Sequence, residues 1–504
     1  MSDLIPLSEA KKRSGKARQN SRRQAPKPDD EISVAVEKLN KSYAFVLMGG
    51  DGWVLRDTQD WDGRPAVEFL AVSAFRMRFD IERYLDGETD RVAGIGTLWM
   101  KHPRRETYDG VAMAPEGVPP GWYNLWRGWA VEPAPKARNP LDHVDHFPNF
   151  HDHIKRNVAR GNVDHEKWIW GWFAQMFQQP TKKPGTALVV RGEKGSGKSK
   201  VGEVFGSLLG SHHVTIDQPK HLTGGFNGHM ANALLLQAEE GFWAGDPVAD
   251  GRLKSLITSH VQLLEKKGVD ATPIRNLIRL IVTSNSDWVV PASFDERRFA
   301  VFDVGNENRQ DHKFFEKIDT EMDAGGRSHL LAYLLAYDLK SVDVRVIPST
   351  SGLFEQKIAS MTELQAWWMD RLREGRLLSQ HEDWRREIST DALFRSFRAY
   401  SEMLKSKARL PSKEQFGIAL RKVMPAGFKG GQKVWVKAYG PNGEELHNAD
   451  KSRTYKRVSG YHIPDLAECR QHFEDLVRWP IDWGSDPEAP QPSGEPSEDF
   501  ELTD

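Results

Sequence analysis

An eight-residue segment, Gly192–Ser199 with the sequence GEKGSGKS, constrains the fold of this chain more than any other. It fits the pattern GxxxxGK(S/T), follows the apolar run ALVV and precedes the helical pattern SKVGEVFGSLLG, which is the context that a phosphate-binding loop requires. In such a loop, glycines let backbone N–H groups surround an anion at a helix N-terminus, while the lysine reaches the β- and γ-phosphates and the serine ligates Mg²⁺. The predicted nucleotide-binding residues are Gly192, Glu193, Lys194, Gly195, Ser196, Gly197, Lys198 and Ser199, the last also as a metal ligand.

A second element is the apolar run NALLLQA, which ends in two acids, Glu239 and Glu240. A buried strand with this ending is typical of a Walker B site. There the first acid helps to hold Mg²⁺ through its waters and the second polarises the attacking water. The first acid is commonly Asp, so Glu239 departs from the pattern by one methylene. The sequence predicts Glu239 as a catalytic, metal-associated residue and Glu240 as the catalytic base.

Two further candidate sites adjoin other apolar runs. Asn285 ends IRLIVTSN, where an amide could hold the lytic water or sense the γ-phosphate; a turn-forming asparagine is an equal alternative. Arg297 and Arg298 precede FAVFDV, and an arginine near a transferring phosphoryl group accelerates the reaction by about 10³–10⁵. In ring ATPases this arginine comes from the neighbouring subunit. The alternative is a solvated cluster of these arginines with Asp295 and Glu296.

Between residues 185 and 304, short apolar runs alternate with helical patterns, which predicts an α/β fold with a parallel sheet. At 504 residues, the chain has room for about three domains. We expect a basic tail over 1–30, an α+β accessory domain over 31–125, a helical collar over 126–183, an ATPase domain over 184–374, a winged-helix-like DNA-binding domain over 375–482 and an acidic tail over 483–504.

The net charge of −1 conceals an uneven distribution, because residues 11–27 carry eight basic side chains and no acid. Such a tail either binds nucleic acid by counterion release or is a solvated extension. No apolar run approaches the ~18 residues of a membrane span. The single cysteine, Cys469, excludes a disulfide framework, and the N-terminus lacks a secretory signal. We therefore expect a cytoplasmic protein.

Four histidines are concentrated in DHVDHFPNFHDHI: His143, His146, His151 and His153. Imidazole and carboxylate groups at this density could ligate Zn²⁺. No cysteine accompanies them, however, and Pro148 interrupts the helical face. This favours a polar connection into the collar over a metal site.

Near the C-terminus, KVWVKAYG and TYKRVSGYHI read as a hairpin with a long turn, following two or three short helices. Basic residues there are interleaved with tryptophan and tyrosine, a combination suited to DNA contact. The predicted contacts are Lys433, Lys437 and Arg453. Ordinary surface lysines are the alternative.

Together these elements resemble the superfamily 3 helicases of viruses and phages, a branch of the AAA+ ATPases. The phage and plasmid primase-helicase group, similar to the poxvirus primase-helicases, is the nearest resemblance. It is carried by WFAQMFQQPTKKPGTALVVRGEKGSGKS, HLTGGFNGHMANALLLQAEEGFWAGD, LKSLITSHVQLLEKKGVDA and RLIVTSNSDWVVPASFDERRFAVFDV. It covers residues 122–372 and is most specific over 184–304.

The resemblance implies an ATP- and Mg²⁺-dependent hexameric ring with DNA in its channel, unwinding from 3′ to 5′. Arg298 matches the arginine finger, with Arg297 in reserve, and Asn285 matches the polar sensor. The segment LKSLITSHVQLLEKKGVD matches a motif whose hairpin projects into the channel, where Lys266 and Lys267 would contact phosphates.

Many relatives also carry an N-terminal primase domain with paired catalytic carboxylates. Here the only nearby pair of acids, Asp60 and Asp62, lies in a loop-like stretch. We therefore expect no primase activity, and a separate primase or polymerase would then be a partner.

These observations favour an ATP-driven DNA helicase or translocase for phage or mobile-element replication in a bacterial cytoplasm. The main alternative is an ATP-switched DNA-binding initiator or scaffold without processive unwinding. A small-molecule P-loop kinase is a second alternative, against which the arginine pair and the basic hairpin argue.

Overall fold

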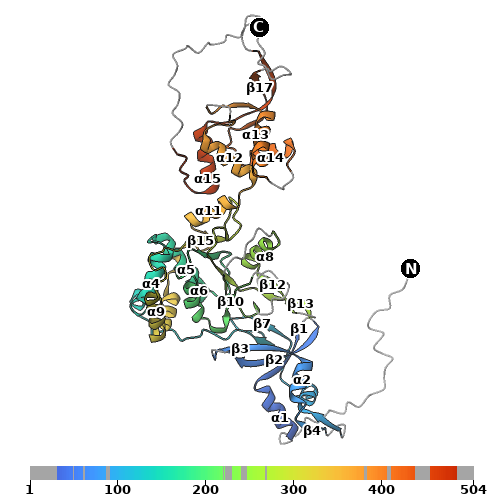
Figure 1. The fold of residues 1–504 in the computed structure, drawn as a ribbon. Coiled ribbons are helices and arrows are strands. Elements are labelled where there is room, and N and C mark those ends of the chain that lie inside the picture. Colours follow the sequence, from blue (N-terminus) through green and yellow to red (C-terminus); the bar gives the residue numbers. More distant parts are fainter. Residues whose placement is uncertain are drawn as a thin grey trace, which may run out of the picture. The chain divides into compact units, whose positions relative to one another are not determined.

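The computed structural model describes residues 31–484, with gaps at 49, 61–62, 87–90, 219–220, 222–229, 240–246, 267–268, 380–382, 406–409 and 438–453. The expected basic tail, and the acidic tail beyond Gly484, lie outside the described residues. The chain forms two compact units (Figure 1). Of the described residues, the first comprises those up to Ala112 together with Gly117–Leu125, and the second comprises Met113–Glu116 together with those from Trp126 onward.

The first unit is built on a four-stranded sheet of order β3-β2-β1-β6. Its elements are α1 (Glu31–Asn40), β1 (Tyr43–Met48), β2 (Asp51–Gln59), β3 (Pro65–Ala71), α2 (Val72–Phe79), β4 (Arg83–Asp86), β5 (Arg91–Gly94), α3 (Ile95–Lys101), β6 (Thr107–Tyr108), β7 (Gly110–Ala112) and β8 (Trp122–Asn124). Side chains from all three helices and from β1 and β2 form one core, centred on Phe75 and Trp99. This is an α+β arrangement.

The second unit contains a five-stranded sheet of order β10-β11-β14-β9-β15, in which every neighbouring pair is parallel. Its strands are β9 (Ala187–Arg191), β10 (His213–Ile216), β11 (Leu235–Glu239), β14 (Arg279–Ser284) and β15 (Phe299–Asp303). Four of these are the apolar runs that predict strands, so the α/β class with a parallel sheet is confirmed. β14 lies between β9 and β11, which brings the ends of three strands to one edge.

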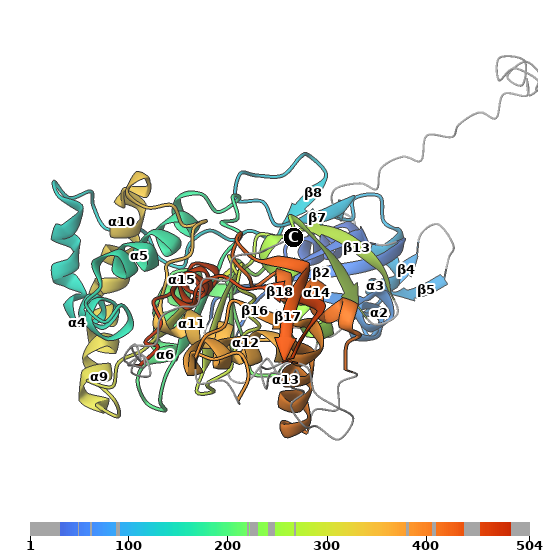
Figure 2. The same ribbon diagram turned by 90° about the horizontal axis from the view of Figure 1, so that it is seen from above.

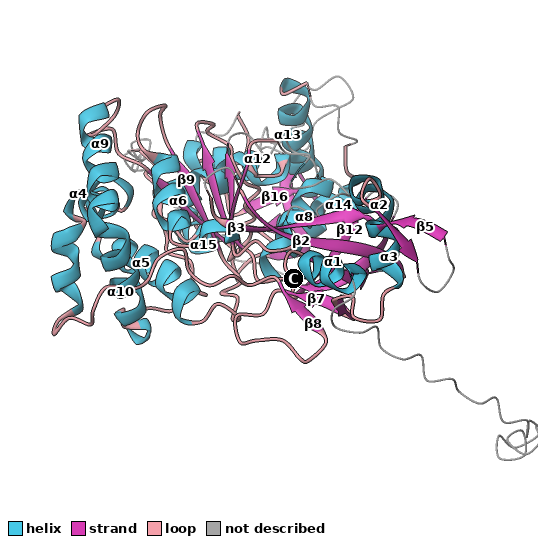
Figure 3. Ribbon diagram, turned by 90° about the horizontal axis from the view of Figure 1, so that it is seen from below, coloured by secondary structure: helices cyan, strands magenta, loops and turns pink. Residues whose placement is uncertain are grey.

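Helices flank this sheet (Figure 3). Helices α4, α5 and α9 gather on one side of it in both Figure 1 and Figure 2, and Figure 2 shows α10 beside them. The elements are η2 (Pro140–His146), α4 (Pro148–Asp152), the π-helix η3 (His153–Val158), α5 (Val163–Gln178), α6 (Lys198–Ser207), η4 (Gly210–His212), α8 (Pro247–Thr258), α9 (His312–Glu321), η6 (Met322–Gly326), α10 (Arg327–Ala336), η7 (Leu339–Ser341) and α11 (Ser351–Ala359). An antiparallel hairpin, β12 (Val261–Lys266) and β13 (Val269–Arg275), leads from α8 to β14.

The C-terminal part of the second unit combines four helices with a three-stranded sheet of order β16-β18-β17. Its elements are α12 (Glu363–Glu374), β16 (Glu387–Ser389), α13 (Thr390–Met403), α14 (Lys413–Arg421), β17 (Lys429–Lys437), β18 (Tyr455–His462) and α15 (Leu466–Val477). Ser389 and Ser412 cap α13 and α14 through side-chain oxygens, which satisfies backbone donors at the helix starts. No helix within the described ranges is long and apolar enough to cross a bilayer.

Candidate functional site

The segment that the sequence predicts to bind phosphate lies between an interior strand of the parallel sheet and the helix that follows it. β9 ends at Arg191 and α6 begins at Lys198, so the segment turns at the carboxyl edge of the sheet. Gly195 and Gly197 have φ angles of 79° and 88°, at which a residue with a side chain is strained. Gly197 directly precedes α6, so the loop leads into the positive end of the helix dipole, which favours anions.

The ammonium group of Lys198 lies inside this loop. Its Nζ donates hydrogen bonds to the carbonyl oxygens of Gly192 (2.9 Å) and Glu193 (2.6 Å), and to Oδ1 of Asn285 (2.7 Å). Lys198 is only 8% exposed, and Asn285 directly follows β14. One amine therefore joins the loop to the end of the neighbouring strand, so that two predicted site residues are in direct contact.

Glu239 ends β11 and points to the same region. Its Oε1 accepts a hydrogen bond from Nε2 of Gln237 (2.8 Å), and the same Nε2 donates to the carbonyl oxygen of Ser199 (3.3 Å). Gln237 is fully buried and therefore holds Ser199 and Glu239 close together, a role that the sequence analysis missed. Glu240 lies outside the described residues.

A cavity of about 430 Å³ joins these groups, within the ~300–1,000 Å³ common for small-molecule sites. One group of lining residues comes from the loop and the ends of β11 and β14, including Lys198, Glu239 and Asn285. A second group comes from α6 and from the segment after β15: Lys200, Glu203, Gln310, His312 and Phe315. The cavity is therefore larger than the part that the predicted motifs account for.

The segment after β15 forms a wall beside the loop. The backbone N–H of Gln310 donates to the carbonyl oxygen of Gly195 (2.9 Å). The ring of Phe315 packs so close to Gly197 that an added Cβ there would lie 2.4 Å from its Cε1. Nothing in the sequence near Phe315 matches a nucleotide-binding pattern, so only the fold could place this wall.

Two residues of η3 hydrogen-bond to the backbone of the loop. His153 Nε2 lies 3.0 Å from the carbonyl oxygen of Gly197, and Asn157 Nδ2 donates to the carbonyl oxygen of Ser196 (3.0 Å). Burial lowers the pKa of His153 to about 4, so its ring is neutral at pH 7 and donates through Nε2–H. The only signal of His153 and Asn157 in the sequence is their spacing of four residues, which places them on one helical face.

Arg297 and Arg298 lie at the opposite edge of the sheet from the loop. The carbonyl oxygen of Arg298 accepts a hydrogen bond (2.7 Å) from the N–H of Ala187, the first residue of β9. The loop begins beyond Arg191, at the other end of the same strand. At about 3.3 Å per residue, these ends are roughly 16 Å apart, farther than an arginine side chain reaches. Neither arginine can therefore serve the loop of its own chain.

Glu296 shapes the turn that carries this arginine pair. Its Oε1 accepts the backbone N–H groups of Arg297 (2.9 Å) and Arg298 (2.6 Å), and the residue is only 2% exposed. The alternative of a solvated acid–arginine cluster is thus wrong for Glu296, which is a buried acceptor. Nε of Arg298 is buried and has no hydrogen-bond partner within the part of the chain that the structure describes.

The predicted DNA contacts are only partly described. Lys433 and Lys437 lie on β17. Lys266 ends β12, but its side chain is outside the described residues, as are Lys267 and Arg453 entirely.

The base of the β12–β13 hairpin is firmly held. Nζ of Lys183 donates to the carbonyl oxygens of Leu256 (2.6 Å) and Ser259 (3.3 Å). Nδ2 of Asn276 donates to the same two oxygens, at 2.9 Å each. Burial, with a contribution from the nearby Arg279, lowers the pKa of Lys183 to about 7. Residues that anchor this hairpin were not predicted from the sequence.

The four clustered histidines go to different places. His153 supports the loop, whereas His151 lies 3.6 Å from a carboxylate oxygen of Glu166. Nδ1 of His143 lies 3.0 Å from Nδ1 of His329, on which the ring of His146 stacks. Among the described residues, no group of three or more His, Cys, Asp or Glu is arranged to hold a metal ion.

Comparisons with known proteins give distant matches. A family model described as "Family of unknown function (DUF5906)" matches residues 190–298. The chain is 22% identical over 241 residues to a protein of Nitratiruptor phage NrS-1 named "DNA Primase-polymerase", covering 44% of this chain. The match spans 33% of that protein, about a third of its length.

Solved structures of the same phage protein have a similar fold. An apo structure of the NrS-1 C-terminal region (305–718) matches 86% of this chain and all (100%) of that chain, with a TM-score of 0.57 and 16% identity. An A-form apo structure of that region matches 84% of this chain and 96% of that chain, with a TM-score of 0.55 and 16% identity. At this identity, the likeness shows a shared fold.

Proposed function

We propose that this chain is an ATP-dependent DNA helicase or translocase with a superfamily 3 AAA+ core, acting in phage or mobile-element replication. The observation that carries the proposal is the contact of Lys198 with Asn285 (2.7 Å). This contact lies in a cavity that Ser199 and Glu239 also line. The proposed phosphate loop, polar sensor and metal-associated acid thus lie at one edge of the sheet. The phage relative, a primase-polymerase by name, supports a role in DNA replication.

We propose that a triphosphate binds in this cavity in one orientation. The γ-phosphate faces Asn285 and Glu239, and Lys198 exchanges the carbonyl oxygens of Gly192 and Glu193 for phosphate oxygens. The nucleoside then lies along the second group of lining residues, beside Phe315. An ion pair of Lys200 with Asp319 (3.0 Å) holds α6 and α9 together along this side.

The residues present suit Mg²⁺, which prefers oxygen ligands. Ser199 and Glu239 line the same cavity, and Gln237 hydrogen-bonds to the backbone carbonyl oxygen of Ser199 and to the carboxylate of Glu239. Ser199 and Glu239 would hold the ion, which would supply positive charge to offset that of the phosphates. Glu240, next in the chain, orients and deprotonates the attacking water.

Arg298 completes the site of a neighbouring subunit, because it lies too far from the loop of its own chain. ATP turnover then requires a ring of subunits. We propose that this ring is a hexamer with DNA in its central channel and that it moves along the DNA from 3′ to 5′. Lys266 and Lys267 contact the phosphates of that DNA. The C-terminal order of helix, strand, two helices and hairpin supports a winged-helix domain, in which Lys433, Lys437 and Arg453 contact DNA.

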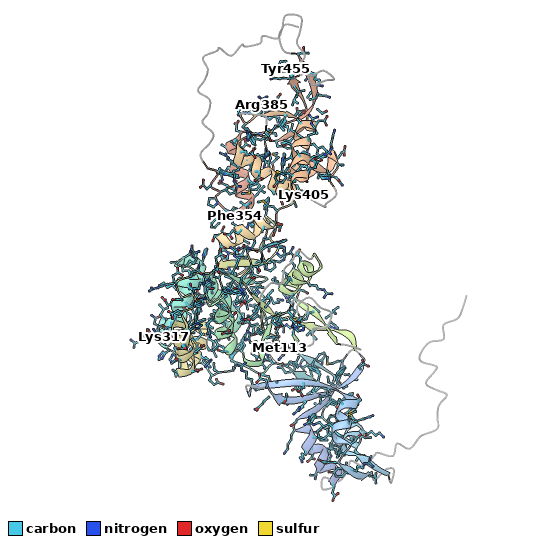
Figure 4. All side chains as sticks on the ribbon, viewed as in Figure 1. Met113, Lys317, Phe354, Arg385, Lys405 and Tyr455 are labelled. Carbon is cyan, nitrogen blue, oxygen red and sulfur yellow. The ribbon has the colours of Figure 1, made fainter. Side chains whose placement is uncertain are left out.

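The proposal is tested by ATP hydrolysis with and without single-stranded DNA, and by strand displacement on 3′- and 5′-tailed forks. Lys198→Ala should abolish hydrolysis while the circular dichroism spectrum stays unchanged. Asn285→Ala should slow hydrolysis and leave nucleotide binding intact. Lys317→Ala, which removes an exposed lysine on α9 (Figure 4), is the matched control and should behave as the unaltered chain.

Two outcomes would count against this function. A folded Lys198→Ala chain with normal turnover would show that the loop is not the phosphate site. Equal DNA affinity with and without nucleotide, combined with no strand displacement on either fork, would favour the initiator or scaffold instead.

A further inference from the structure

The β17–β18 hairpin carries aromatic and cationic side chains in a regular arrangement on one face. Trp435 pairs with Arg457, and Lys437 pairs with Tyr455. Directly opposed residues of antiparallel strands point to the same face. These four side chains therefore form a two-by-two block in which the aromatic residues occupy one diagonal and the cations the other. Lys433, two residues before Trp435, extends the same face.

This face takes no part in the protein core. Trp435 is 59% exposed and Tyr455 is 50% exposed, whereas Val434, on the opposite face of β17, is 1% exposed. The guanidinium of Arg457 lies 5.6 Å from the centroid of the Trp435 ring. Tyr455 lies at the outer end of the hairpin (Figure 4). Two large aromatic rings therefore remain at least half exposed to water.

A basic groove adjoins these residues. It has a volume of about 1440 Å³, and Trp435, Lys437 and Tyr455 line it together with α13 and α14. Six of its lining residues are basic and three are acidic: Arg385, Arg395, Lys413, Arg421, Lys437 and Lys456 against Glu387, Asp391 and Glu414. The surplus of three positive charges suits a polyanion, and the volume exceeds that of most small-molecule sites, ~300–1,000 Å³.

We propose that this face binds single-stranded DNA by stacking unpaired bases on Trp435 and Tyr455, with backbone phosphates held by the flanking cations. The choice of DNA rests on the proposed function, whereas the choice of a single strand rests on the aromatic rings. Bases within a duplex are stacked on one another and expose only their edges in the grooves, so they offer no free face to an indole. Unpaired bases stack on aromatic side chains whatever their sequence.

Cations alone would bind the phosphates of single and double strands. The rings distinguish the two substrates, because removing a ring that stacks on a base weakens single-strand binding by about 5- to 100-fold. Removing one flanking lysine, Lys433, should instead make binding less sensitive to salt. In a plot of the logarithm of the binding constant against the logarithm of the salt concentration, the slope for a single strand should become shallower by about 0.7.

The test uses fluorescence anisotropy of the full chain without nucleotide. A labelled dT oligonucleotide of about 16 nucleotides is compared with a duplex of equal length and with an abasic sugar-phosphate strand. Trp435→Ala and Tyr455→Ala should each weaken binding of the dT strand by about 5- to 100-fold. They should leave duplex and abasic binding within about twofold, and Trp435→Phe should retain most of the affinity.

Met403→Ala is the matched control, because Met403 is 69% exposed on α13 but does not line the groove; it should bind as the unaltered chain does. Equal weakening of single strand, duplex and abasic strand by Trp435→Ala would overturn the proposal. Equal or tighter binding of an RNA strand of the same length would overturn the choice of DNA. Hydrolysis by the unaltered chain is measured separately, so failure of the motor and failure of this site are distinguishable.

Discussion

Replacing Arg298 by alanine should separate nucleotide binding from hydrolysis. Arg298 is paired with the first residue of the five-residue strand β9, and the loop follows the last, so about 16 Å separates it from the site of its own chain. A guanidinium supplied across an interface contributes about 10³–10⁵ in rate. We expect hydrolysis to fall by about that factor while the Kd for a labelled ATP analogue stays within about twofold.

Mixing two inactive variants turns this geometry into a quantitative test. An Arg298→Ala chain keeps Glu240 in its own site, and a Glu240→Gln chain still offers Arg298 to its neighbour. In a closed ring assembled from equal amounts, about half of the donors and about half of the acceptors are intact, so about a quarter of the interfaces are complete. If sites act independently, the mixture should hydrolyse ATP at about a quarter of the unaltered rate, whatever the ring size.

The assay is phosphate release after subunit exchange, with each variant alone as the baseline. Arg345→Ala removes an exposed arginine that pairs with Asp343 and should leave the rate unchanged. Arg298→Ala with more than about half of the normal turnover would refute an essential role of this side chain. A mixture no faster than its separate components, despite proven subunit exchange, would refute action across an interface.

Three further predictions concern the loop and its walls. Gly197→Ala should lower the free energy of unfolding, measured in urea, by about 2–5 kcal/mol, because a Cβ would strain the backbone and press on Phe315 and His153. Gly185 has a similar φ but open space around it, so the control Gly185→Ala should lower the same free energy by only about 1–2 kcal/mol. Phe315→Ala should weaken ATP binding by about 3- to 10-fold but leave the binding of inorganic tripolyphosphate unchanged in a competition assay. An equal loss of affinity for both ligands would contradict the proposal that the nucleoside lies beside Phe315. The folded pKa of His153, about 4, lies below the unfolded value of about 6.5. The free energy of unfolding should therefore fall by ~2 kcal/mol between pH 7 and pH 5, as the pH falls into the interval between these two pKa values. In urea unfolding, the His153→Gln variant should show a smaller dependence of this free energy on pH.

The parts of the fold that the sequence predicts are those with a local signal. The strands over Ala187–Arg191 and Arg279–Ser284 are apolar runs bounded by polar residues, and both form. The strand over His213–Ile216 was missed because it is only four residues long, lies at a sheet edge and has a single buried residue, Ile216.

The site was predictable to the extent that its residues lie in motifs. The loop segment and Asn285 are found by pattern, but their direct contact depends on β14 lying between β9 and β11, and strand order has no signature in a single sequence. The same holds for His153 and Gln237. His153 contacts the loop and Gln237 contacts α6 through hydrogen bonds between residues that are 38 or more positions apart in the sequence. Nothing in the local sequence distinguishes these two residues from any other buried polar residue.

The path of the backbone between the two compact units limits how the protein can be divided. Met113–Glu116 belongs to the second unit although Gly117–Leu125 returns to the first, so no single cleavage separates them. A truncation that starts at Trp126 discards Glu116, whose carboxylate pairs with Arg275 at the end of β13. A shortened protein that keeps this ion pair must therefore start no later than Glu116, and it then carries Gly117–Leu125 of the other unit with it.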